Sequence, residues 1–155
     1  MKRPLLAALA AGCLTLTAPA TASASASAGI DVRTYRISYL QYPETGKARA
    51  QLRNITVTWR RDRADKRVWV TVSAQLRDSG PGDGHCARMT LLADSGYFAL
   101  GKTTVKECNG VWQTRSLASE PGNFELGTQL LLQTNPNGSW TSRNLTNPWD
   151  PSPGR

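Results

Sequence analysis

"ITVTWRRDRADKRVWVTVSAQL", residues 55–76, decides the fold class of this 155-residue chain. Apolar and polar side chains alternate with a period of two on both sides of a charged centre. Alternation of this kind, rich in Val, Thr and Trp, is typical of half-buried β-strands and not of helices. The stretch therefore predicts an antiparallel hairpin within an all-β protein.

The apolar residues of the two runs fall on one face of the predicted hairpin. They are Ile55, Val57, Trp59, Val68, Val70, Val72, Ala74 and Leu76. Pairing Trp59 with Val68 brings all of them to the same side, as the selection of register by burial requires. This register turns Trp59 toward the core and makes residues 60–67 the connection between the strands.

The opposite face of the hairpin is polar and rich in hydroxyl groups. It carries Asn54, Thr56, Thr58, Trp69, Thr71, Ser73 and Gln75. A tryptophan ring among hydroxyl groups suits a carbohydrate, since the ring stacks on a sugar and the hydroxyls form hydrogen bonds. The alternative is that a loop or a second sheet covers this face and that Trp69 belongs to the core.

The hairpin connection "RRDRADKR", residues 60–67, concentrates positive charge. Its basic residues are Arg60, Arg61, Arg63, Lys66 and Arg67, against the two acidic residues Asp62 and Asp65. One interpretation is a cationic projection for an anionic surface or for the acidic cleft of an enzyme. The other is a solvated tip whose charges prevent edge-to-edge aggregation. Either way, we expect net positive charge to reach solvent.

Period-two segments bounded by turn residues recur along the chain. The predicted strands are residues 32–41, 50–59, 68–77, 86–93, 98–108, 111–117 and 126–134. About seven short strands at this spacing favour an antiparallel β-sandwich, with a small barrel as the alternative. The pair Asn109-Gly110 is a hairpin signal between two of these strands.

The N-terminal segment has the pattern of a secretory signal peptide. Lys2 and Arg3 precede an apolar run, and Ala-x-Ala sites follow, with cleavage expected after Ala28. We therefore expect an exported, extracellular protein with a signal peptide at 1–28, a β-sandwich domain at 29–143 and a flexible, proline-rich tail at 144–155. Cys13 lies in the apolar run behind only a loose lipobox, so lipid anchoring is a minor alternative.

Two cysteines, Cys86 and Cys108, lie beyond the predicted signal peptide. In an oxidising compartment an isolated pair most simply forms one disulfide. A bridge between them closes a loop of about 23 residues, which loop entropy values at roughly 3.4 kcal/mol. Cys86 is then neither a nucleophile nor a metal ligand, and the neighbouring His85 is interpreted as a solvated loop histidine.

Motifs for catalysis, cofactors and metals are lacking in this sequence. It has no Gly-x-Ser-x-Gly elbow and no glycine-rich phosphate loop before a helix, and its acidic residues have no spacing that selects a catalytic pair. One histidine and two bridged cysteines do not suit zinc, and Asp78 and Asp83 do not match an EF-hand. We predict no enzymatic activity, no cofactor and no metal.

The charge balance indicates the class of partner. Removing Lys2 and Arg3 from the 19 basic residues leaves 17 against 11 acidic ones, a net charge of +6. Positive charge favours anionic partners such as cell-wall polymers or acidic protein surfaces. Nucleic acid is disfavoured because the chain is expected to be exported and no recognition motif is present.

Two resemblances add to this interpretation. In its alanine-rich leader, its Val- and Thr-rich strands and its single cysteine pair, the whole chain resembles small uncharacterised secreted proteins of streptomycetes. Residues 58–86 resemble the tendamistat family of α-amylase inhibitors. The matching positions are Trp59-Arg60, Ala64-Asp65, Thr71-Val72, Gly84 and Cys86.

The tendamistat resemblance implies an all-β sandwich that inhibits through a Trp-Arg-Tyr triplet at a hairpin. Trp59 and Arg60 would then be inhibitory residues. The chain departs from the pattern because Arg61 stands in the third position, and because Leu52 and Val68 occupy the positions of the family's first disulfide.

The sequence thus predicts a secreted, non-catalytic binding or structural protein. Its partner would be an anionic cell-wall polymer, a carbohydrate or a secreted enzyme. The alternative is an inhibitor of a secreted hydrolase. The binding candidates are Trp69, Arg60, Arg61, Arg63, Lys66, Arg67 and Trp59.

Overall fold

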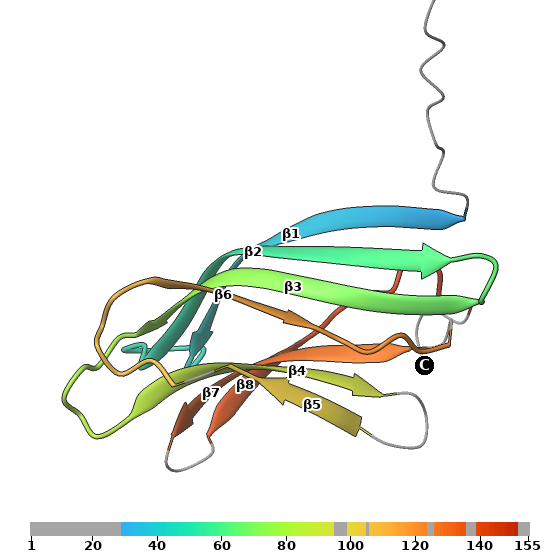
Figure 1. Cartoon of the computed structure of the whole chain (residues 1–155). Coiled ribbons are helices and arrows are strands. Elements are labelled where there is room, and N and C mark those ends of the chain that lie inside the picture. The colour runs from blue at the N-terminus through green and yellow to red at the C-terminus, as the bar shows by residue number, and fades with distance from the viewer. Residues whose placement is uncertain (1–28, 95–98, 105, 124–125, 136–138, 152–155) are drawn as a thin grey trace, which may run out of the picture.

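The computed structural model describes residues 29–94, 99–104, 106–123, 126–135 and 139–151. The predicted signal peptide and Cys13 lie outside these residues. The described chain is all-β and forms two layers of antiparallel strands (Figure 1). The strands are β1 (Ile30–Tyr42), β2 (Ala50–Asp62), β3 (Arg67–Asp78), β4 (Cys86–Asp94), β5 (Ala99–Thr103), β6 (Gln113–Ala118), β7 (Gly127–Asn135) and β8 (Trp140–Asn144).

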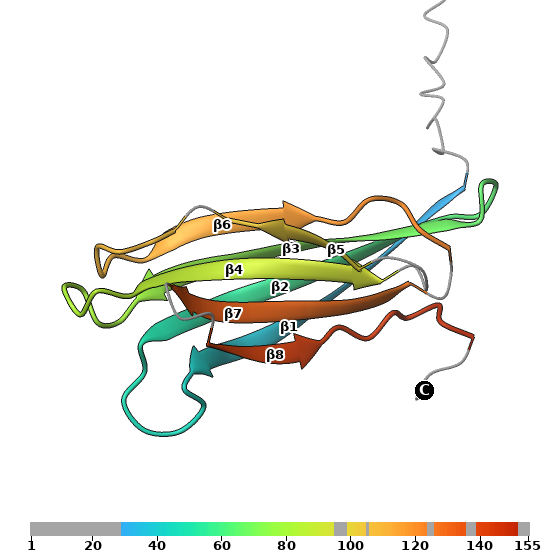
Figure 2. The same cartoon turned by 90° about the horizontal axis from the view of Figure 1, so that it is seen from below.

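The predicted antiparallel β-sandwich is confirmed. One sheet has the strand order β1-β2-β3-β6 and the other has the order β5-β4-β7-β8. β1, β2 and β3 are consecutive neighbours, whereas β6 joins them only after the chain has passed through β4 and β5 of the other sheet. Figure 2 shows β1 and β8 on the same side of the molecule.

The core lies between the sheets and uses the alternation described above. Every apolar residue on the predicted core face of the hairpin is buried, with Trp59 and Val70 both 0% exposed. β4 and β7 supply the opposing layer, which includes Met89, Leu91 and Leu130. The period-two pattern therefore specifies which side of each strand is buried.

The predicted register of the hairpin is wrong by two residues. Trp59 pairs with Val70, and Val68 pairs with Arg61. The same residues still face the core, because a shift of two positions preserves the face of a strand. β2 extends to Asp62 and β3 begins at Arg67, so the turn between them is shorter than the predicted connection 60–67.

A β-bulge interrupts the pairing of β2 with β3 between Arg53 and Thr56. Asn54 adopts a φ of 52° there, a left-handed conformation that asparagine tolerates better than most residues. The extra residue keeps Leu52 and Ile55 in the core while Arg53 and Thr56 both face outward. The bulge therefore maintains the outward face along the whole length of β2.

Asn109-Gly110 does not close the predicted hairpin. β5 pairs with β4 in one sheet, whereas β6 pairs with β3 in the other. The turn is nevertheless real, since Gly110 has a φ of 69° and the Asn109 Oδ1 accepts the Val111 N–H at 3.0 Å. It redirects the chain from one sheet to the other, and the strand predicted at 98–108 ends at Thr103.

The predicted loose tail is wrong for residues 144–151. Leu145 is 4% exposed and its N–H donates to the Thr128 carbonyl at 2.9 Å. Trp149 packs against the edge of the core. The sequence also did not predict β8, which pairs with β7 just before this segment. The packed domain therefore extends beyond residue 143, and residues 152–155 lie outside the described part.

The predicted disulfide between Cys86 and Cys108 is confirmed, with the two Cα atoms 4.5 Å apart. It joins the start of β4 to the segment that crosses between the sheets. An isolated bridge between Ala87 and Glu107 supports the same junction, with two backbone hydrogen bonds of 2.8 Å. The described residues contain no helix that is long and apolar enough to cross a membrane.

Candidate binding surface

The outward face of the β1-β2-β3-β6 sheet is the candidate surface. Strand pairing aligns its residues in rows across the four strands. One row joins Thr34, Thr58 and Thr71, and another joins Arg36, Thr56 and Ser73. β6 extends these rows with Ala118 opposite Thr71 and Ser116 opposite Ser73. The result is a broad surface of hydroxyl, amide and guanidinium groups.

None of the outward residues of this sheet is buried. Each one, from β1 through β6, keeps an intermediate or a full exposure. The alternative in which a loop or a second sheet covers Trp69 is therefore wrong, because the second sheet packs on the other side. Trp69 itself is half-buried among its neighbours, so the residue is partly accessible.

Five arginines face outward from this sheet: Arg36, Arg53, Arg60, Arg67 and Arg77. Among the outward positions of its four strands, the one carboxylate is Asp62, at the hairpin end. Its Oδ1 accepts the backbone N–H groups of Ala64 and Asp65 at 2.8 and 3.2 Å. The face is consequently cationic along the remainder of its length.

One end of the face is organised around Trp112. The guanidinium of Arg53 lies 4.1 Å from the centroid of this ring, and that of Arg77 lies 5.6 Å from it. Such cation–π contacts hold the charged groups in place without neutralising them. The Arg53 Nε also donates to the Gln75 Oε1 at 2.7 Å, which further fixes its position.

The other end of the face is organised around Trp69. Arg60 pairs with Trp69 across the strands and donates from its Nη1 to the Thr71 Oγ1 at 3.3 Å. From Trp69 to Arg77 along β3 is eight residues, or about 27 Å at the rise of a strand. Two aromatic groups with adjacent arginines therefore flank a central zone of hydroxyl groups.

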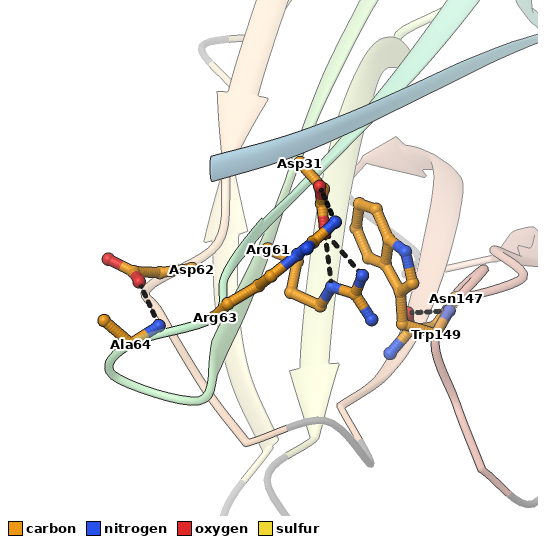
Figure 3. Close-up of polar contacts among 7 residues, drawn as sticks. All are labelled: Asp31, Arg61, Asp62, Arg63, Ala64, Asn147 and Trp149. Carbon is orange, nitrogen blue, oxygen red and sulfur yellow. Dashed lines mark hydrogen bonds and ion pairs between the residues drawn. The ribbon is translucent and has the colours of Figure 1, made fainter. Parts of the chain in front are cut away.

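Two arginines of the hairpin tip are held by ion pairs that the sequence did not predict. Asp31 of β1 lies between Arg61 and Arg63 and forms ion pairs with both guanidinium groups (Figure 3). The Arg63 contact measures 2.7 Å, and the Arg61 Nε donates to Asp31 at 2.9 Å. Hydrogen bonds from Arg63 and Arg61 lower the pKa of Asp31 to about 2.

Arg61 is also held from the C-terminal side of the chain. Its guanidinium lies beside the Trp149 ring (Figure 3), 4.9 Å from the ring centroid. The Trp149 N–H donates to the Asn147 Oδ1 at 3.0 Å, which fixes the segment that carries the ring. Arg61 therefore links Asp31, near the start of the packed chain, to Trp149, near its end, and is no free cation.

Lys66 and Arg67 remain exposed at the tip. Lys66 has a φ of 52°, so it occupies the left-handed position of a turn that the Asp62 carboxylate stabilises. These two cations, with Arg60, are the members of the predicted charged connection that still reach solvent without an ion pair to Asp31.

Trp59 is not a binding residue as predicted, because it lies in the core and is 0% exposed. An inhibitory Trp59-Arg60 pair, as the tendamistat resemblance implies, would need an exposed indole. Trp59 and Arg60 instead point to opposite sides of the sheet. The tip therefore does not present them together.

The region around His85 is more enclosed than the solvated loop that the sequence predicts. The His85 N–H donates to the Asp83 Oδ1 at 2.8 Å, and the Nδ1 of its ring is buried, so it is not the fully solvated histidine expected. Asp78 is 1% exposed, and burial raises the pKa of its carboxyl. Within the described residues, no three His, Cys, Asp or Glu side chains gather to hold a metal ion.

Arg36, Arg53, Arg77 and Trp112 were not among the site residues predicted from the sequence. Arg36 and Arg77 occupy outward positions of predicted strands, so the alternation itself could have placed them on this face. Strict alternation puts Arg53 on the core side with Ile55, and the bulge turns it outward. Trp112 gave no such signal, because its partners come from β2 and β3, far away in the sequence.

No protein-family model, no curated protein and no solved structure matches this chain.

Proposed function

We propose that this is an exported, non-catalytic binding protein whose outward face on the β1-β2-β3-β6 sheet binds an anionic polysaccharide, such as a polymer of the cell surface. The observation that carries the proposal is the combination of five arginines, two tryptophans and rows of hydroxyl groups on one accessible face. Arginine binds carboxylate and phosphate groups in a bidentate manner, and aromatic rings stack on sugar faces.

The length of the face favours a polymer over a single sugar. Trp69 and Trp112 lie near its opposite ends, with hydroxyl groups between them. A face about 27 Å long can contact several sugar units at once. Since each exposed contact contributes little, affinity would come from many weak contacts along one chain.

The test compares polygalacturonate, which carries one carboxylate on each sugar, with neutral dextran. We expect binding to polygalacturonate that weakens as salt rises, because exposed charges are screened over about 8 Å at physiological ionic strength. The double variant Arg53→Ser/Arg77→Ser should lose about two- to thirtyfold in affinity, from roughly 0.2–1 kcal/mol for each exposed ion pair.

The matched control is Lys47→Ser/Lys106→Ser, which removes the same charge from exposed positions outside this face. It should bind polygalacturonate almost as the unchanged protein does. Equal losses in the two double variants would mean that only net charge matters, and equal binding to dextran would reject the anionic ligand.

A further inference from the structure

β1 forms the edge of its sheet along all of its 13 residues. Within the described part of the chain, β1 pairs with β2 and with no other strand. β8 is likewise the edge of the second sheet, and Figure 2 shows it beside β1. The backbone N–H and C=O groups on the free side of an edge strand can pair with another extended chain.

A groove of about 600 Å³ runs between these two edges. β1 contributes Tyr35, Arg36 and Ile37 to it. The opposite wall consists of Ser142, Arg143, Asn144 and Thr146. Arg36 and Arg143 are both exposed, and the lining contains two cations and no carboxylate.

Further along the same edge, β1 exposes two apolar side chains. Ile30 is 44% exposed and Val32 is 53% exposed. They alternate with Thr34 and Arg36 on the outward side of the strand. A strand that paired with this edge would therefore meet apolar groups at one end and arginine at the other.

We propose that the free edge of β1 accepts an extended acidic segment of a partner protein, which adds to the sheet as a further strand. Its backbone would bind the β1 edge, and its carboxylates would contact Arg36 and Arg143. Recognition of this kind takes affinity from main-chain hydrogen bonds and specificity from alternate side chains.

A second copy of this chain is a poor occupant of the same edge. Antiparallel pairing of two β1 strands about the groove would place Arg36 directly opposite its counterpart. Like charges directly opposite each other destabilise a strand pair. An acidic segment has the complementary charge, whereas a second copy has not.

The probe is an acetylated ten-residue peptide of alternating Glu and Val, titrated into isotopically labelled protein. We expect shifted amide resonances at residues 35–37 and slower hydrogen exchange along β1. The same peptide with its backbone nitrogens methylated keeps its charge but loses its donors, and it should not bind. A peptide of Gln and Val should bind more weakly by at least twofold.

Two variants separate this groove from the polysaccharide surface. Arg143→Ser should weaken peptide binding about two- to fivefold and leave polygalacturonate binding unchanged. Arg53→Ser should do the reverse. Unchanged peptide affinity in Arg143→Ser, or undiminished binding of the methylated peptide, would overturn strand addition. Displacement of the peptide by oligogalacturonate in Arg53→Ser would show that the groove takes the saccharide instead.

Discussion

At one end of the sandwich Asp31 holds Arg61 and Arg63 by ion pairs, and at the opposite end a disulfide joins Cys86 to Cys108. Both junctions fasten segments that are distant in the sequence. The ionic junction depends on the protonation of one carboxyl, whereas the covalent one does not. Acid and reductant should therefore weaken different ends of the same domain.

The two ends also contain carboxyl groups with opposite pKa shifts. Hydrogen bonds from two arginines lower the pKa of Asp31, whereas burial raises the pKa of Asp78 beside the loop that leads to Cys86. A lowered pKa means that the folded state favours the carboxylate, and a raised pKa means that it favours the neutral acid. One fold thus uses the same residue type in opposite ways.

Removal of the disulfide should cause the largest loss of stability. Cys86→Ser/Cys108→Ser should lower the free energy of unfolding by roughly 3 kcal/mol, because the unfolded chain regains the entropy of an open loop of about 23 residues. Urea unfolding at pH 7 measures the loss, and reduction of the unchanged protein should reproduce it. An unfolding midpoint that stays constant after reduction would contradict the proposed stabilisation.

A smaller effect should come from the ionic end. Because the folded pKa of Asp31 is about 2, against an ordinary value of 3.8, its contribution to stability is present above pH 4 and is lost as pH falls toward 2. Asp31→Asn should lower stability at neutral pH and flatten the acid side of the stability curve between these values.

The control for Asp31 is Asp65→Asn, in which an exposed carboxyl of the same hairpin tip is removed. It should leave the acid side of the curve unchanged. Thermal unfolding across pH 2–7 gives both results. A curve for Asp31→Asn that parallels the unchanged protein would show that the ion pairs contribute nothing to folding.

Replacement of Asp78 should have the smallest effect on stability, and this effect should be opposite in sign to that of replacing Asp31. Its folded pKa lies above the ordinary value of 3.8, so the unchanged protein loses stability as pH rises through the raised value. Asp78→Asn should remove that loss while its amide oxygen still accepts the Gly80 N–H. If Asp78→Asn lost stability above pH 4 as steeply as the unchanged protein does, that loss would be due to another group.

The sequence predicts the interior of the sandwich better than its connections. Alternation identifies the buried side of β2 and β3, since burial acts on every second residue of a strand. It does not distinguish the pairing of Trp59 with Val68 from its pairing with Val70, because both keep the same residues buried. The observed pairing is accompanied by a tight turn, in which the Asp62 Oδ1 accepts the N–H groups of Ala64 and Asp65.

The connections depend on tertiary contacts that no local signal contains. Asn109-Gly110 has the composition of a hairpin turn, yet the adjoining strands belong to different sheets. The prolines after Asn144 suggested a loose tail, whereas Leu145 fills a place in the core. In the candidate surface, Trp69 follows from alternation, but the position of Trp112 depends on arginines of two other strands.

The uneven distribution of charge over the two outward faces bears on how the molecule would lie against a surface. One face presents five arginines, whereas among the described outward side chains of the β5-β4-β7-β8 sheet Arg88 is the single cation. Near a polyanion, such a distribution exerts a torque that turns the arginine face inward. Trp140, 54% exposed on the far side, would then point to solvent. A layer of these molecules would be oriented, with one face adhering and the other displayed.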